Sequence, residues 1–335
     1  SAYQVPLSAE ENPHIGVFGT DPSTAAPTEE GLNPKSYQLY KRDWSDHALD
    51  TIASFHTRIL SRNEKQFLVL QRQLFAEQEQ DIIKRLLMER TISGIRSKAL
   101  GDAFFSIPAW VAKWFKRGYP ALLAALTQSA EKQTSVFKLP STFNPGTVNV
   151  KNWLDDRVNF WATRVNEETA KLLAEEIEDA IANGESIKDI QTRIERIFNF
   201  SSSIRSEMIA RTEVQAATNH GALEAYKQSG VVESKMWVAT LDDRVRQHHL
   251  EAHRQIVPLE ANFEVGGEMI SAPGDGSAAN AINCRCTLVP ILSTQKQLQP
   301  ETKELVPRVK TIHKRIIKDD DGVPVEVLET HTDGA

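Results

Sequence analysis

Cysteine is almost absent from this chain. The 335 residues contain only Cys284 and Cys286, and a single residue separates them. A disulfide between cysteines this close in sequence would be strained, so a fold held together by disulfides is excluded. Reduced thiols are typical of proteins made in the cytoplasm, and we expect this chain to be synthesised there.

Long apolar runs are missing as well. No stretch of about eighteen apolar residues occurs, and the N-terminus lacks the basic and then apolar pattern of a signal peptide. We therefore expect no membrane-spanning segment and no export by that route. The net charge of -6 gives no overall positive field, so any contact with DNA must come from a local basic patch.

The common catalytic motifs are also absent. The sequence contains no Walker A motif, GxGxxG, GxSxG or HExxH. His249 and His253 have the spacing of the two histidines in HExxH, but Leu250 stands where the glutamate of that motif would be. These absences disfavour nucleotide-binding, serine hydrolase and metalloprotease functions.

The spacing of apolar residues predicts a mostly α fold with a small α+β module near the C-terminus. Residues 1–35 are rich in Pro, Ser, Thr and acidic residues and are expected to form an extended N-terminal arm. Residues 36–138 are predicted as a helical domain with long helices, because no glycine or proline lies between Ser36 and Thr91. The turn-rich segment 139–150 is the predicted linker.

Residues 151–230 are predicted to form an antiparallel bundle of three helices. Apolar residues recur at intervals of three and four in the first helix, which Gly184 is expected to end. Ser186 is a candidate cap for the second helix, and the third is expected to run from about Ser202 to Ser229, with Gly230 closing it. Short loops between such helices favour antiparallel packing.

The apolar period changes after Gly230, and residues 231–292 are predicted as the α+β module. Strands are expected at 231–240 and 286–292, with a helix at 243–254 between them. Turn signals in the intervening segment are typical of a hairpin and a loop. Mixed strands and a helix of this size suit a small module appended to the helices.

Residues 293–335 are predicted to be a flexible C-terminal tail with a basic patch. Three aspartates directly follow this patch, and such charge runs are usually solvated. A contact with double-stranded DNA is the alternative, and its affinity would fall steeply with salt. The candidate DNA-binding residues are Arg308, Lys310, Lys314, Arg315 and Lys318.

A stripe of polar residues is expected on the third bundle helix, where Arg211, Gln215 and Asn219 follow at intervals of four. Buried polar groups need partners, and the aspartates at 242 and 243 with the nearby arginines are the candidates. Asp243 or its neighbour also suits the N-cap of the next helix. We interpret the set as a structural network: Arg211, Glu213, Gln215, Asn219, Asp243, Arg244 and Arg246.

A candidate zinc site combines two pairs of residues. His249 and His253 are one turn apart on the predicted helix, and Cys284 and Cys286 point to the same side of an extended segment. Four such ligands would form a closed, structural His2Cys2 site. The alternatives are buried thiols beside surface histidines, or a zinc-assisted hydrolase or nuclease, for which no carboxylate is clearly placed as general base.

An ordered set of motifs between about residues 155 and 292 resembles the phage Mu F-like minor head protein family, also called phage head morphogenesis proteins. Val245 departs from the family, which often has threonine there. The matching motifs include Ile209-Ala-Arg-Thr-Glu213, Asn219, Trp237, Asp243-Arg-Val-Arg246, His249, Pro273-Gly274 and Asn283-Cys-Arg-Cys286.

The resemblance implies a minor head protein of a tailed phage or prophage. Such a protein would be made in the host cytoplasm and lie in the virion, inside the capsid near the portal vertex. Its expected partners are the portal protein, other capsid proteins and packaged DNA, and its expected roles are head assembly and packaging or delivery of DNA. The resemblance does not imply an established enzymatic activity. Residues 36–138, which the resemblance does not cover, are expected to contact the portal or capsid.

Overall fold

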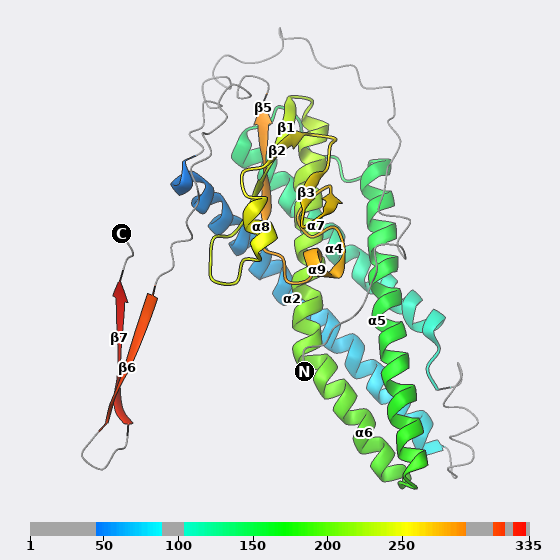
Figure 1. Cartoon of the computed structure of the whole chain (residues 1–335). Helices are drawn as coiled ribbons and strands as arrows, with labels where there is room; N and C mark the ends of the chain where they lie inside the picture. The colour runs from blue at the N-terminus through cyan, green and yellow to red at the C-terminus, as the bar shows by residue number, and fades with distance from the viewer. Residues whose placement is uncertain (1–44, 89–103, 293–310, 319–323, 333–335) are drawn as a thin grey trace.

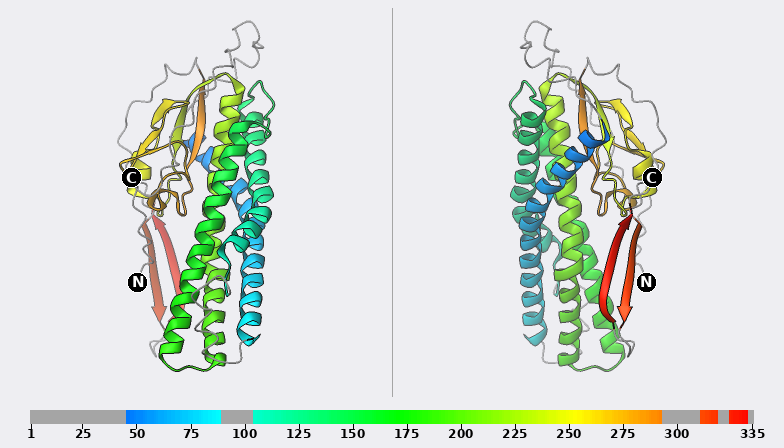
Figure 2. Two further views of the ribbon diagram at one scale, coloured as in Figure 1. Left: turned by 90° about the vertical axis from the view of Figure 1, so that its right-hand side faces the viewer. Right: turned by 90° about the vertical axis from the view of Figure 1, so that its left-hand side faces the viewer.

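The computed structural model describes residues 45–88, 104–292, 311–318 and 324–332. Long helices lie side by side, and a small β module covers one side of them where α7 leads into β1 (Figures 1 and 2). This arrangement confirms the predicted mostly α fold with an α+β module. The predicted arm, residues 1–35, lies outside the described residues. The long helices are α2 (Asp46–Met88), α4 (Ile107–Phe137), α5 (Val148–Ala182), α6 (Ile187–Phe200) and α7 (Ser206–Ser229).

The ends of the helices follow the local sequence. The Thr147 hydroxyl accepts a hydrogen bond from the Val150 amide and caps α5. Ser186 and Asp189 form a reciprocal capping box at the start of α6, as the cap prediction required. Gly184 and Gly230 follow α5 and α7 with φ of 70° and 68°, a conformation that glycine adopts without a steric penalty.

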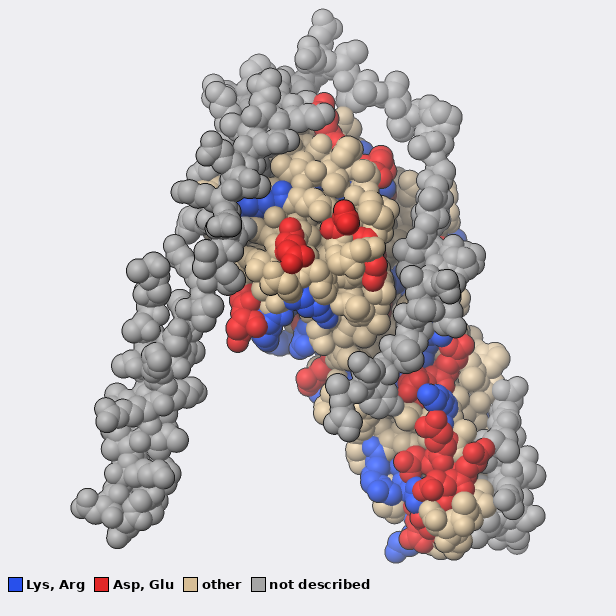
Figure 3. Space-filling view, in the orientation of Figure 1, with Lys and Arg blue, Asp and Glu red and all other residues tan. Residues whose placement is uncertain are grey.

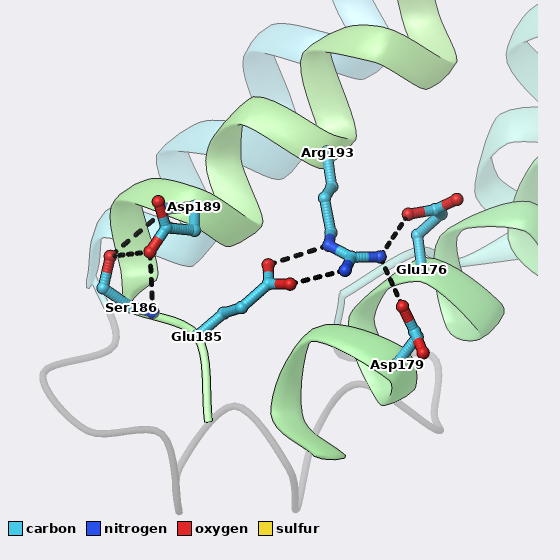
Figure 4. A network of polar contacts seen from close by, with 6 residues as sticks. All are labelled: Glu176, Asp179, Glu185, Ser186, Asp189 and Arg193. Atoms are coloured by element: carbon cyan, nitrogen blue, oxygen red, sulfur yellow. Dashed lines mark hydrogen bonds and ion pairs between the residues drawn. The ribbon is translucent and has the colours of Figure 1, made fainter. Parts of the chain in front are cut away.

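Hydrogen bonds from Arg193 of α6 connect this helix to the C-terminal part of α5 and to the loop between the two helices (Figure 4). Arg193 Nη1 donates to Glu176 Oε2 at 2.8 Å and to Asp179 Oδ2 at 2.7 Å, while Arg193 Nε donates to Glu185 Oε2 at 2.8 Å. Acidic side chains gather around this end of the helices in Figure 3. One guanidinium therefore balances three carboxylates that would otherwise repel one another.

The structure differs from the predicted three-helix arrangement where α6 meets α7. The π-helical segment η4 (Ser201–Arg205) joins the two helices into one bent helix, so among the three helices predicted for residues 151–230 only α5 and α6 form an antiparallel hairpin. The serine hydroxyls bond within the helix: Ser203 Oγ donates to Asn199 O at 2.8 Å, and Ser206 Oγ donates to Ser201 O at 2.6 Å. A serine run without glycine or proline bends the helix but does not end it.

One hydrophobic core spans both sides of the predicted linker. Phe75 of α2 and Trp114 of α4 lie edge to face with ring centroids 4.9 Å apart, and Trp161 of α5 lies 5.3 Å from Trp114. Val214 of α7 belongs to the same buried cluster. The segment 139–150 therefore connects helices of one body and does not separate two cores.

Helices α4 and α7 approach each other closely at Gly221. A Cβ atom on this residue would lie 2.2 Å from the Leu126 carbonyl oxygen of α4. Real Cβ atoms do not come so close to backbone, so the absence of a side chain at position 221 sets the distance between the two helices.

The β module contains two small antiparallel sheets. The central strand β1 (Val232–Val238) pairs with β2 (Ile256–Pro258) on one side and with β5 (Thr287–Leu292) on the other. A hairpin of β3 (Phe263–Val265) and β4 (Glu268–Ile270) forms the second sheet. The two longer strands and the hairpin confirm the sequence prediction, while the three-residue β2 is too short to show a period.

Two short helices complete the module. Helix α8 (Gln247–Glu251) has five residues, begins after Arg246 and is shorter than the predicted 243–254. Helix α9 (Ala278–Ala281) precedes the two cysteines. The segment from Asp242 to Arg246 is not helical. The Arg244 amide donates to the Asp242 side chain, and the Arg246 guanidinium donates to the Ile282 carbonyl.

The tail contains a pair of strands, which differs from the predicted flexible segment. Strand β6 (Thr311–Lys318) pairs antiparallel with β7 (Pro324–Thr332), and both contain β-branched residues that favour strands. Lys314, Arg315 and Lys318 lie on β6, while Arg308 and Lys310 lie outside the described residues. Across the described ranges, no helix combines the length and apolar character needed to cross a membrane.

Candidate functional site

The polar stripe of α7 binds the main chain of the cysteine segment. Gln215 Nε2 and Asn219 Nδ2 both donate to the carbonyl oxygen of Cys286, the latter at 3.0 Å. Asn219 Nδ2 also lies 2.9 Å from Pro273 O. Gln215, Asn219 and Cys286 are all buried. The stripe thus has the buried partners that its polarity required, but these partners are backbone carbonyls and not the predicted aspartates.

The start of the Asn283–Cys286 segment is fastened to the same helix. Arg211 Nη1 donates to Asn283 Oδ1 at 3.0 Å, and the Asn283 amide donates to Thr212 Oγ1 at 3.2 Å. Asn283 has a φ of 56°, a left-handed conformation that asparagine tolerates better than most residues. Arg246 Nη2 donates to the Ile282 carbonyl. Side chains from two elements therefore fix the turn that leads into the cysteines.

Asp242, and not the predicted Asp243, joins the polar network. Its carboxylate accepts hydrogen bonds from both Nη atoms of Arg285 and from the Arg244 amide at 3.0 Å. Burial alone would raise the pKa of Asp242, but these bonds hold it below its ordinary value. The Asp243 side chain is 92% exposed, and the Arg244 guanidinium is largely exposed as well.

Glu213 lies on another face of α7 and pairs with Arg157 of α5. Arg157 Nε donates to Glu213 Oε2 at 2.6 Å, and Nη2 donates to Oε1 at 3.3 Å. The two side chains are only 13% and 8% exposed. Arg157 is 56 residues away in sequence and no motif marks it, so sequence reasoning missed this partner.

The structure brings three of the four predicted metal ligands together. His249 Nδ1 lies 3.3 Å from Cys286 Sγ and 3.8 Å from Cys284 Sγ, and all three residues are buried. His253 stands apart, because its Nδ1 accepts a hydrogen bond from the Ala239 amide at 3.1 Å. Helix α8 ends at Glu251, so the one-turn spacing expected for the two histidines is lost.

The ring of His249 is oriented by Asn280. Asn280 Nδ2 donates to Val265 O at 3.3 Å, which leaves its Oδ1 facing His249 Nε2 at 3.1 Å. Because Oδ1 only accepts, Nε2 carries the proton and the lone pair of Nδ1 faces the sulfurs. Trp237 packs edge to face on the ring at 5.6 Å. His249 is thus fixed with its basic nitrogen toward both cysteines.

The two thiols differ in acidity. A hydrogen bond from Cys286, reinforced by His249, holds the pKa of Cys284 well below its ordinary value. Burial raises the pKa of Cys286. The pair therefore favours one thiolate, the form of cysteine that binds metals and acts as a nucleophile.

A small hollow lies beside these three residues and has room for about one water molecule. Lys and Arg side chains gather at this edge of the β module (Figure 3). The polar residues that line the hollow next to the His249 and cysteine side chains are Thr240, Arg244, Arg246, Asn283 and Arg285.

His56 of α2 extends the buried polar chain behind the site. Its Nε2 lies 3.1 Å from Gln215 Oε1, and Gln215 in turn donates to the Cys286 carbonyl. Burial lowers the pKa of His56 from 6.5 to about 4, although the bond to Gln215 opposes the shift. His56 is therefore neutral in the folded chain at neutral pH.

This burial predicts a loss of stability in acid. Because the folded pKa is lower than the unfolded one, the stability from neutral His56 is present above pH 6.5 and lost as the pH falls toward 4. We expect a loss of about 2 kcal/mol between pH 7.5 and pH 5 from this group. Urea unfolding at both pH values measures it. In H56Q the loss should shrink by a similar amount, and an unchanged loss would contradict the assignment.

The comparisons with known proteins agree with these motifs. Residues 171–289 match the family described as Phage Mu protein F like protein. Minor head protein GP7 of Bacillus phage SPP1 is 28% identical over 36% of this chain and 40% of its own length. YqbB of Bacillus subtilis is 29% identical over 47% of this chain and 53% of its own length.

A relative of a different kind is the NAD(+)--arginine ADP-ribosyltransferase EFV of Enterococcus faecalis, which is 26% identical over 60% of this chain and 42% of its own length. The chain thus spans about half, or less, of the length of these relatives. No solved structure matches the chain significantly. The match to the family described as Phage Mu protein F like protein covers α7, the Asn283–Cys286 segment and most of the β module, and it confirms the resemblance that the ordered motifs predicted.

Proposed function

We propose that this chain is a minor head protein of a tailed phage, associated with the portal inside the capsid and active in head assembly and in packaging or delivery of DNA. Support comes from the family of residues 171–289 and from the relative named minor head protein GP7. The basic residues on β6 are the candidate contact with double-stranded DNA.

The proposal rests mainly on the internal hydrogen bonds and ion pairs that the motif residues make. Asp242 is paired with Arg285, Glu213 with Arg157, and the α7 amides with the main chain of the cysteine segment. Each of these polar groups is thereby occupied by an internal partner. These contacts hold the β module and the long helices together. Polar groups engaged in this way suit a structural protein better than a catalyst.

The runner-up function is a zinc-assisted hydrolase or nuclease acting during phage entry. It requires a general base near the metal position. The described residues that line the hollow include no carboxylate, and the nearby Asp242 is held by Arg285. The activity named for EFV belongs to that protein, of which this chain spans 42%. We therefore propose a non-enzymatic role.

The helices before the family segment supply a candidate docking part. Helices α2 and α4 share the core with α7, so they hold a fixed position relative to the β module. We propose that this helical part contacts the portal or capsid. Because α2 and α4 share one hydrophobic core with α7, binding at these helices would fix the position of the β module as well, with no hinge between two domains.

Deleting the gene from its phage tests the function. We expect particles that assemble poorly or fail to deliver DNA, and we expect the wild-type protein to copurify with portal protein from mature heads. Normal particles with normal infectivity would contradict the proposal. Binding of the purified chain to duplex DNA, with affinity that falls steeply as salt rises, tests the DNA contact.

A further inference from the structure

We propose that His249, Cys284 and Cys286 form a three-ligand site for one zinc ion, bound through Nδ1 and both Sγ atoms, with solvent in the fourth position. The three ligand atoms come from α8 and from the Asn283–Cys286 segment, and they lie within 4.8 Å of one another. This inference does not depend on the proposed function, because it concerns metal content alone.

The distances suit a tetrahedral ion. Zinc bonded to sulfur at about 2.3 Å and to nitrogen at about 2.0 Å places neighbouring ligand atoms about 3.5 to 3.8 Å apart. His249 Nδ1 lies 3.3 Å from Cys286 Sγ and 3.8 Å from Cys284 Sγ. These two edges of the tetrahedron already exist, so binding needs only small movements of side chains.

The chemistry of the donors selects the metal. Two sulfurs and one imidazole nitrogen are soft ligands, which favour zinc over calcium or magnesium. The three side chains are almost fully buried, and the cysteines pack with Trp237 and Phe263 in a small separate core. A metal would add cross-links to a part of the module that has few apolar residues.

The supporting contacts are those of a metal-binding histidine. Such a histidine usually donates its second ring N–H to a neighbouring acceptor, which fixes the tautomer. Asn280 fills this role through Oδ1 at 3.1 Å from His249 Nε2. The bond from Asn280 Nδ2 to Val265 O prevents the amide from turning over. Asn280 is therefore a positioning residue for the site.

The cysteine segment is held in place without the metal. Gln215 and Asn219 bind the Cys286 carbonyl, and the Cys284 amide donates to Ala281 O at 3.2 Å. Both sulfurs therefore face His249 through contacts made by the main chain. A site prepared in this way loses little conformational freedom when the ion binds.

Among the described residues, no fourth His, Cys, Asp or Glu joins the three ligands. His253 uses Nδ1 to accept from the Ala239 amide, so the closed His2Cys2 set of the sequence prediction is replaced by three ligands. Asp242 is held by Arg285. The hollow beside the sulfurs has room for about one water molecule, which would complete the tetrahedron.

Metal analysis of the full chain tests the inference. The protein is loaded with zinc, dialysed and analysed by mass spectrometry, and we expect one zinc per chain. In C284S and C286S we expect at least about a 10-fold loss of zinc affinity in competition with a chelating dye, and in N280A about a 10- to 100-fold loss. H253Q is the matched control and should keep the wild-type affinity.

Cobalt provides a readout that does not depend on the variants folding. Wild-type protein loaded with Co2+ should show thiolate-to-cobalt charge-transfer bands and the strong visible absorption of a tetrahedral site. A wild-type chain that retains no zinc and shows no such bands would overturn the inference. Loss of zinc in a folded H253Q would also overturn it, because that result requires His253 as a ligand.

Discussion

Replacing Glu213 by alanine is expected to lower the free energy of unfolding by about 3 to 5 kcal/mol, because the change leaves the Arg157 guanidinium buried without its partner. The two side chains are 13% and 8% exposed in the pair. Burial by itself would lower the pKa of Arg157, yet the attraction of Glu213 outweighs it and raises that pKa. Removing the glutamate removes this attraction, but a guanidinium is not deprotonated in proteins, so the arginine stays charged in the variant.

Urea unfolding of the wild type and E213A measures this loss. The control is E207A on the same helix, whose partner Arg72 is 47% exposed and whose own side chain is 54% exposed, so we expect a change below about 1 kcal/mol. The double variant R157L/E213L removes both charges and should recover most of the stability. A loss in E213A no larger than that in E207A would show that Arg157 finds another partner.

The second large effect is expected at Gly221, where alanine should destabilise the chain by about 2 to 3 kcal/mol. Helix propensity alone predicts the opposite, a gain of about 1 kcal/mol. The added Cβ would lie 2.2 Å from Leu126 O, however, and α4 must move away to admit it. Because backbone cannot rotate aside as a side chain can, packing outweighs propensity here.

Thermal unfolding followed by circular dichroism distinguishes the two effects. G184A serves as the control, since Gly184 has a φ of 70° and nothing lies within 4 Å of an added Cβ. It should cost only about 1 to 2 kcal/mol of backbone strain. G221V should be worse than G221A and is expected not to fold. A melting temperature of G221A above that of the wild type would refute the close approach of α4 and α7.

Local signals explain which parts of the fold were predictable. The helix from Asp46 to Met88 follows from the absence of breakers, and the caps at Ser186 and Gly230 follow from residue types with one conformational preference. The stripe of Arg211, Gln215 and Asn219 was also predictable, because a helix of fixed period puts them on one face.

The partners of these residues could not be predicted in the same way. Asp242 and Asp243 are adjacent and chemically identical, and only the course of the turn decides which one meets Arg285. His253 leaves the zinc cluster because α8 stops after five residues. Tertiary contacts set both outcomes, and no periodicity in the sequence records them.

The Asn283–Cys286 segment is located mainly through its main chain, and this has a consequence for how the site varies. Every residue type presents the same carbonyl oxygen, so Gln215 and Asn219 would bind position 286 whatever side chain it carried. Helix α7 therefore fixes the position of the Asn283–Cys286 segment, while the side chains of that segment determine which thiols face His249. We therefore expect that replacing the cysteines leaves the position of the loop unchanged, whereas replacing Gln215 or Asn219 removes hydrogen bonds that hold the Cys286 end of the loop.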